Sequence, residues 1–165
     1  MINNNFEKKL KSKEFVFTAE TSPPDSTVRS EITDRVLCLK DLADAINVTD
    51  GASAKSHLSS LVVSSIIKDI EIEPILQLTT RDRNRIAIQS DLLGAWTLNI
   101  HNILCIYGDQ VETGDQPETK EVRDLDTLGV INTANYFKKE KKFPSGRAIK
   151  SCLLYTSDAA DEKRC

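Results

Sequence analysis

The sequence has 165 residues, of which 39% are hydrophobic and 28% charged, and its formal net charge is -3. This balance is typical of one globular domain; it argues against a disordered chain and, because no basic patch stands out, against a nucleic-acid binder. No apolar run approaches the roughly 20 residues that cross a bilayer, and the N-terminus lacks the apolar core of a signal peptide, so we expect a cytoplasmic protein without membrane contact.

The N-terminal part predicts a helix, a strand and a second helix. Phe6 and Leu10 stand four residues apart, which favours a short amphipathic helix. Glu14–Glu20 is rich in Phe and Val and predicts the first strand, which the Pro-Pro loop of residues 21–26 ends. Ser26 or Thr27 is then expected to cap a helix. Its apolar stripe would be Val28, Ile32, Val36, Leu39 and Ala43.

Three further strand–helix pairs follow. Ala45–Thr49 predicts the second strand, Pro74–Thr79 the third and Asn102–Tyr107 the fourth. The helices after the third and fourth strands are expected over Asn84–Asn99 and from Leu125 to Lys139. The helix after the second strand would present one face made of Leu58, Leu61, Val62, Ser65 and Ile66.

The C-terminal segment Cys152–Glu162 reads CLLYTSDAADE, which resembles the translation of a transposase-type sequencing-library adapter over eleven consecutive residues. We therefore expect residues 152–165 to be a non-native tail and residues 1–151 to hold the protein proper. The alternative is a short strand followed by a capped polar terminus. The cysteines contain no CxxC pair and no histidine pair stands near them, so no metal site is expected.

Strands that recur about every 30 residues with a helix between them predict a parallel sheet covered by helices, an α/β fold. The two candidate architectures are a doubly wound sheet and a (β/α)8 TIM barrel. The first strand–helix turn lacks G-x-G-x-x-G, so a dinucleotide site of the Rossmann type has no support. A barrel needs about 200 residues or more, and this chain would therefore hold only the first four βα units.

Polar side chains stand where each predicted strand ends: Glu20, Thr49, Gln77 with Thr79, and Asp109. In a barrel the active site lies at these carboxyl ends. Glu20 ends an apolar strand and precedes the rigid Thr-Ser-Pro-Pro exit, where a desolvated carboxyl with a raised pKa would serve as a general acid. The alternative is a solvated glutamate that merely marks the strand end.

Two other groups of polar residues stand out. The cluster Arg81-Asp82-Arg83-Asn84-Arg85 opens the third strand's helix, and such clusters are usually solvated, although its place at the rim leaves room for an anionic ligand. His57 and His101 are isolated in the sequence, so we expect surface or packing roles for them.

The segments FVFTAETSPP, INVTDGASA, EPILQLTTRDRNRIAIQSDLLGA and ILCIYGDQVETGDQPE together resemble the methylenetetrahydrofolate reductase family, flavoproteins built on a (β/α)8 barrel. The resemblance covers about Glu14 to Lys150 and implies that residues 1–151 are the N-terminal portion of such a barrel domain. It implies that Glu20 is the catalytic general acid and that Asp109 faces both flavin and pterin. The cofactor contacts that it implies are Thr49, Asp50, Ala52, Gln77, Thr79, Tyr107, Gly108, Asp109, Val122 and Arg123.

The implied reaction is an oxidoreduction in which NAD(P)H reduces FAD and the flavin reduces methylenetetrahydrofolate to methyltetrahydrofolate, for methionine synthesis or one-carbon metabolism. Folate would be the substrate and the full-length parent a homo-oligomer. Because half of the barrel is missing, we expect the chain by itself to be inactive and to expose sheet edges. Two alternatives stay open: a non-catalytic half-barrel binding module, and a pterin-dependent methyltransferase barrel without flavin.

Overall fold

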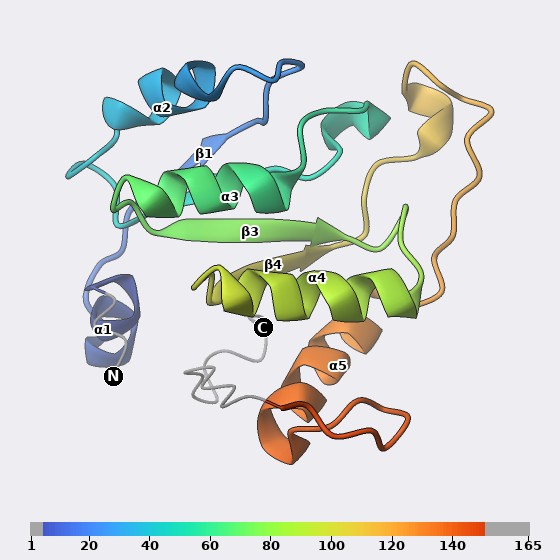
Figure 1. The fold of residues 1–165 in the computed structure, drawn as a ribbon. Helices are drawn as coiled ribbons and strands as arrows, with labels where there is room; N and C mark the ends of the chain where they lie inside the picture. The colour runs from blue at the N-terminus through green and yellow to red at the C-terminus, as the bar shows by residue number, and fades with distance from the viewer. Residues whose placement is uncertain (1–4, 151–165) are drawn as a thin grey trace.

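The structure is a computed structural model and describes residues 5–150. The expected tail, residues 152–165, lies outside the described residues. Within them, four parallel strands form one sheet in the order β1-β2-β3-β4, and Figure 1 labels β1, β3 and β4. The strands are β1 (Thr18–Thr21), β2 (Ala45–Val48), β3 (Pro74–Thr79) and β4 (Asn102–Ile106).

Each helix after the first follows one strand and packs on the same side of the sheet. These helices are α2 (Arg29–Leu37), α3 (Ser60–Asp69), α4 (Arg85–Thr97) and α5 (Thr127–Glu140). They succeed one another in chain order from top to bottom of Figure 1, and consecutive helices touch. Sequential strand order with one helix layer is the arrangement of consecutive units of a (β/α)8 barrel, whereas a doubly wound sheet reverses its strand order. Within residues 5–150 no further strand closes the sheet.

The hydrophobic core lies between the helices and one face of the sheet. Ile46 and Val48 of β2 are fully buried there, and alternate residues of β3 and β4 continue the same layer. Because successive strand residues point to opposite faces, the intervening positions point away from the helices. That second face carries Glu20, Asn47 and Gln77, and it is where a barrel places its interior.

Helix α1 (Asn5–Ser12) confirms the short amphipathic helix expected around Phe6 and Leu10. Phe6 is fully buried, and it closes a small cavity of about 150 Å³ with Thr18, Asn47 and Asn102 among its lining. These residues lie at or near the amino ends of the strands, so α1 covers the end of the sheet opposite to the strand termini that carry the polar residues.

The first strand begins later than predicted. The expected strand was Glu14–Glu20, but β1 starts at Thr18, and Phe15 and Phe17 are 86% and 56% exposed. The reason is the neighbouring strand: β2 starts at Ala45, and the preceding Asp44 accepts the Phe17 N–H through its carboxylate at 3.0 Å. Asp44 also donates its N–H to the Phe17 carbonyl oxygen at 2.8 Å, so the pairing reaches Phe17, and β2 has no residue opposite residues 14–16.

The predicted helix stripe from Val28 to Ala43 is also too long. Helix α2 ends at Leu37 because the chain must turn back into β2, and Asp41 takes a left-handed φ of 67° in that turn. Ile32 and Val36 are buried as expected, whereas Val28 is exposed and serves as the N-cap position in place of Ser26 or Thr27. The Ser26 hydroxyl still accepts the Val28 N–H at 3.1 Å.

The predicted face of α3 is confirmed in part. Ile66 is buried as predicted, and Leu58 and Leu61 pack against the core. Val62, expected on the same face, is 45% exposed, while Val63 and Ile67 are buried instead. The other helices begin and end within about two residues of their predicted limits, and β3 matches its predicted range. No helix among residues 5–150 is long and apolar enough to span a membrane.

Candidate active site

A cavity of about 320 Å³ opens at the carboxyl ends of the four strands. Glu20 comes from β1, Gln77 from β3 and Ile106 from β4, and the other lining residues follow directly after β2 and β4. The full lining is Glu20, Thr49, Asp50, Ala52, Gln77, Ile106, Gly108 and Asp109. Parallel strands bring all their carboxyl ends to one edge, so residues up to 89 positions apart in the chain meet there.

Glu20 and Gln77 contact each other across the sheet. The amide Nε2 of Gln77 donates a hydrogen bond to Glu20 Oε2 at 3.2 Å, and Glu20 Oε1 has no protein partner among the described residues. The expected desolvation of Glu20 is not met, because this residue lies on the edge strand β1 and is exposed. Gln77 by contrast is buried. The pair therefore offers one carboxylate oxygen held by an amide and one oxygen open to a ligand.

Asp109 is held at the other side of the cavity by the loop after β2. Its Oδ2 accepts the backbone N–H of Ser53 at 2.7 Å. Ser53 and Ala54 belong to the short 3-10 turn η1 (Ala52–Ala54), and both have left-handed φ angles of 56° and 53°. Non-glycine residues adopt this conformation only where the surroundings hold them in it. The Asp109 carboxylate is one such support.

Asp50 lines the cavity, but its carboxylate is already satisfied by the protein. Oδ2 accepts the Thr79 N–H at 2.9 Å and Oδ1 accepts the Ser60 hydroxyl at 3.0 Å. Arg83 donates to both oxygens, at 2.6 and 3.2 Å, and also donates to Asp91 at 2.8 Å. Burial raises the pKa of Asp91, against the opposing effect of Arg83. Asp50 therefore ties β2 to β3 and α3, and any ligand contact there would use its backbone.

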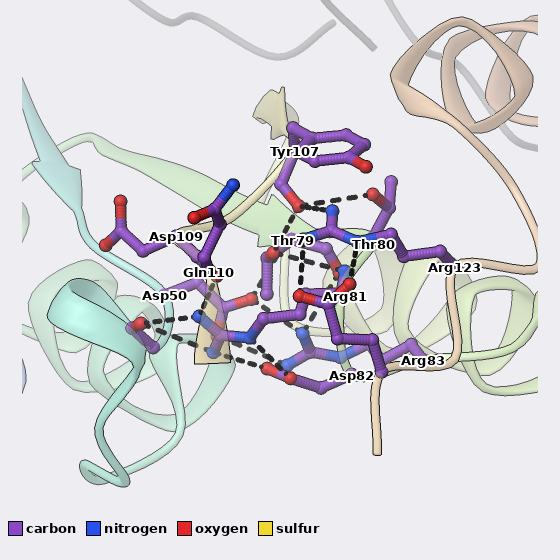
Figure 2. Close-up of polar contacts among 12 residues, drawn as sticks. Asp50, Thr79, Thr80, Arg81, Asp82, Arg83, Tyr107, Asp109, Gln110 and Arg123 are labelled. Carbon is purple, nitrogen blue, oxygen red and sulfur yellow. Dashed lines mark hydrogen bonds and ion pairs between the residues drawn. The ribbon is translucent and has the colours of Figure 1, made fainter. Parts of the chain in front are cut away.

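The arginine cluster after β3 is not the solvated surface that the sequence analysis favoured. Arg81 is only 4% exposed, and Figure 2 shows its guanidinium lying between the loops that follow β2 and β4. It forms a bidentate ion pair with Asp82 at 2.7 and 2.8 Å and donates to the carbonyl oxygens of Gly51 and Asp109. Its pKa is raised, chiefly by the hydrogen bonds to Asp82. Arg85 matches the expectation, pairing with Asp124 at the surface, and Asp82 and Asn84 of the same cluster are also exposed.

A signal for these buried arginines was present in the sequence. Arg81 and Arg83 directly follow a strand with both faces buried, and their partners stand at the ends of neighbouring strands. Glycines at those same strand ends, Gly51 and Gly108, leave room for a large side chain to pass. Ile106 is the lining residue that the sequence analysis did not name as part of the site, and it ends β4.

Four residues that the resemblance implied as cofactor contacts lie outside the cavity lining. Thr79 is fully buried beneath it, and its hydroxyl donates to the Tyr107 carbonyl at 3.3 Å. Tyr107 is 56% exposed at the rim, with the Arg123 guanidinium 3.5 Å from its ring centroid. Val122 is exposed and donates its N–H to the Arg81 carbonyl at 2.8 Å. Tyr107 and Arg123 thus lie at the edge of the site (Figure 2), and Val122 adjoins Arg123 in the chain.

A larger hollow of about 810 Å³ lies at the amino ends of the strands. Its lysines are paired with neighbouring carboxylates: Lys9 with Asp44 at 2.6 Å and Lys68 with Glu73 at 2.5 Å. The bond from Lys9 also lowers the pKa of Asp44. The cavity of about 320 Å³ is therefore the better candidate, because its polar groups come from β1, β3 and the loops after β2 and β4, and because an oxygen of Glu20 stays unpaired toward it.

The two histidines lie away from the reacting groups of this cavity. His101 is buried against Trp96, with ring centroids 4.4 Å apart, which agrees with a packing role. His57 contacts the Asp25 carboxylate at 2.6 Å and the Ala52 carbonyl at 3.2 Å, so it braces the turn η1. Within residues 5–150, no group of three or more His, Cys, Asp or Glu side chains is arranged to hold a metal ion.

Comparison with known families gives one match. The family model described as methylenetetrahydrofolate reductase matches residues 5–148, which include all the strands and helices of the described residues and all eight residues of the cavity. A search of curated proteins found no match.

Proposed function

The chain belongs to the methylenetetrahydrofolate reductase family, a family of oxidoreductases of folate metabolism, and from this premise we propose that its cavity is part of an FAD site at which NAD(P)H serves as the electron donor. The observation that carries the proposal is the cavity at the strand ends. Seven of its eight lining residues are ones that the family resemblance implies as catalytic or cofactor-binding, and Glu20 and Asp109 are the two that we propose as catalytic.

The residues present fit a flavin ring. The ring is flat, with carbonyl oxygens and nitrogens along one edge and an apolar benzenoid part. Thr49, Gln77 and Asp109 offer a hydroxyl, an amide and a carboxylate, and Ile106 offers an apolar wall. Gly108 has a φ of 87°, and because it has no side chain a planar ligand can approach its backbone closely. FAD, when bound, supplies hydride transfer from NAD(P)H to the folate methylene carbon.

Glu20 is proposed as the general acid. When the methylene bridge of the folate opens, the departing amine nitrogen needs a proton, and a carboxyl group within hydrogen-bond reach supplies it. Gln77 holds Oε2 of Glu20, so Oε1 is the oxygen positioned to carry that proton. Buried Gln77 thereby restricts the direction in which an otherwise exposed acid points.

Asp109 is proposed as the electrostatic partner of that step. Opening of the bridge leaves a cationic iminium group on the folate, and a fixed carboxylate nearby stabilises positive charge that develops there. Ser53 takes Oδ2 of Asp109 through its N–H, which leaves Oδ1 for the cavity. The two carboxylates thus have separate proposed tasks: Glu20 donates a proton and Asp109 stabilises the positive charge on the folate.

The test begins with the cofactor. The 165-residue chain is titrated into FAD, and quenching of flavin fluorescence is followed; binding of methyltetrahydrofolate is measured separately by calorimetry. Because the chain by itself is expected to be inactive, binding and not turnover is the readout. Saturable quenching supports the proposal. Binding of folate without flavin quenching would favour a flavin-free methyltransferase, and absence of both would favour a non-catalytic binding module. Glu20→Gln removes the proposed acid, and Glu14→Gln, which changes a carboxylate outside the cavity, is its matched control.

A further inference from the structure

We propose that Arg81 is a positioning residue, which clamps the loops after β2 and β4 together and so sets the direction of the Asp109 carboxylate in the cavity. The proposal rests on the proposed function only for the role of the Asp109 carboxylate in the folate reaction. The geometry of the clamp itself is independent of any ligand. Figure 2 shows the guanidinium of Arg81 and the hydrogen bonds that it makes to both sides.

The Arg81 guanidinium forms hydrogen bonds with both loops. Arg81 Nη1 donates to the Asp109 carbonyl at 3.1 Å and to the Gly51 carbonyl at 3.3 Å, and Nη2 donates to the same Gly51 oxygen at 3.3 Å. Asp82 takes the remaining side of the guanidinium through Nε and Nη2. Only a planar group with several fixed N–H directions meets these oxygens at once, which a lysine ammonium on a flexible stem does not reproduce.

Both loops leave space for the Arg81 side chain. A Cβ on Gly51 would stand 2.5 Å from Arg81 Nη2, and a Cβ on Gly108 would stand 3.1 Å from Arg81 Cβ and 2.2 Å from Thr79 Oγ1. Both glycines also have positive φ angles, 59° and 87°. The loop after β2 therefore passes the guanidinium, and the loop after β4 passes Arg81 Cβ, at positions where a larger residue would collide with its neighbours.

These contacts of Arg81 also fix the direction of the Asp109 carboxylate. By holding the Asp109 carbonyl and the Gly51 carbonyl to one group, Arg81 fixes the separation of the two loops. That separation lets Asp109 Oδ2 reach the Ser53 N–H at 2.7 Å within the left-handed turn η1. If the clamp is loosened, the turn loses its support and Asp109 loses its fixed direction. Arg81 thus acts through Asp109 and has no direct contact with the cavity.

The ligand-free test is hydrogen–deuterium exchange of the full chain, read on peptides that cover residues 51–55. Arg81→Lys should speed exchange in these peptides about tenfold, the change expected when a charge-assisted bond that holds a loop is lost. Arg85→Lys, which alters a surface arginine four residues away, should leave them unchanged. Unchanged exchange in Arg81→Lys would overturn the proposal. If circular dichroism shows that this variant is unfolded, Asp82→Asn takes its place, because it weakens the hold on the guanidinium from a half-exposed position.

The second readout is a double-mutant cycle on FAD affinity with the wild type, Arg81→Lys, Asp109→Ala and the double variant. Arg81→Lys should weaken binding about tenfold when Asp109 is present and less than about twofold when it is absent, because neighbours that act through one another are not additive. Equal weakening in both backgrounds would show a general structural role and reject the positioning role. Absence of FAD binding by the wild type would reject the proposed function, while the exchange result would still decide whether Arg81 clamps the loops.

Discussion

Gln77 Nε2 donates to Glu20 Oε2 across 3.2 Å, although the two residues are 57 positions apart and lie on strands that do not pair with each other. Strand β2 runs between them, so the bond crosses the end of the sheet on the side away from the helices. The exposed acid on the edge strand is thereby oriented by a buried amide from a central strand. A role for Glu20 in proton transfer therefore depends on β3 as much as on β1.

In the full-length parent that the family resemblance implies, Glu20→Gln should slow the folate half-reaction by about 10²–10⁴-fold, which is the usual contribution of a general acid. Reduction of flavin by the nicotinamide needs no proton from this side chain, and its rate should stay within about tenfold. Stopped-flow measurement of the two half-reactions separates these effects. Equal slowing of both would mean that Glu20 supports the flavin site generally and is not the acid.

Gln77→Met should slow the folate half-reaction about tenfold, because the acid remains but loses the group that orients it. In a Glu20→Gln background the same change should add less than about twofold, since the amide then has no acid to orient. Gln116→Met, in an exposed loop, provides the control. A full tenfold loss in the Glu20→Gln background would show that Gln77 acts on the ligand directly.

His101 should make the fold less stable in acid. Burial, reinforced by the charge of Lys68, lowers the pKa of His101 to about 4, and neither ring nitrogen has a partner among the described residues. An unfolded histidine titrates near 6.5, so between pH 6.5 and 4 the unfolded chain binds the extra proton and stability falls as pH falls. The loss by pH 5 should be about 1–2 kcal/mol.

His101→Phe tests this directly, because the aromatic ring can keep its packing on Trp96 without a titrating group. Urea unfolding of the variant and the wild type between pH 7 and 5 gives the two slopes. The variant should lose most of the stability difference between these pH values. Parallel slopes would show that other groups cause the acid sensitivity.

Asp50→Ala should destabilise the fold by about 3 kcal/mol, because it removes the partner of a largely buried guanidinium together with acceptors for the Thr79 N–H and the Ser60 hydroxyl. Arg83 keeps its bond to Asp91, which places the loss at the lower end of the range for broken buried pairs. Asp69→Ala, which breaks the exposed pair with Arg29, should cost less than about 1 kcal/mol. Chemical denaturation of the three proteins measures both losses, and similar values for the two variants would contradict the assignment.

The strand order and the central elements could be predicted from the sequence because burial on both faces leaves a clear signal. β3 is a central strand and matches its predicted range of Pro74–Thr79. The start of β1 could not be predicted in this way, since Phe15 and Phe17 have the composition of a strand but no partner beyond Asp44. The pattern of one segment contains no information on where its neighbour begins.

The cavity residues could be predicted for a related reason: polar residues that end parallel strands meet at one edge, and the family resemblance indicates which of them to expect. The buried state of Arg81 could not, because it depends on two backbone carbonyls from other loops. Carbonyl groups occur at every position, so no residue type marks them. The exposure of Glu20 depends likewise on its position at the edge of the described sheet, which its own segment does not reveal.

Each strand of the sheet after β1 pairs with the strand synthesised just before it, and each of α3, α4 and α5 packs beside the helix just before it. A chain emerging from the ribosome can therefore add one βα unit at a time to a surface that already exists, without waiting for distant segments. The same order makes substitutions in the early strands the most damaging. A codon change that unfolds β2 removes the template for β3, and with it Gln77, Arg81 and every later contact of the cavity.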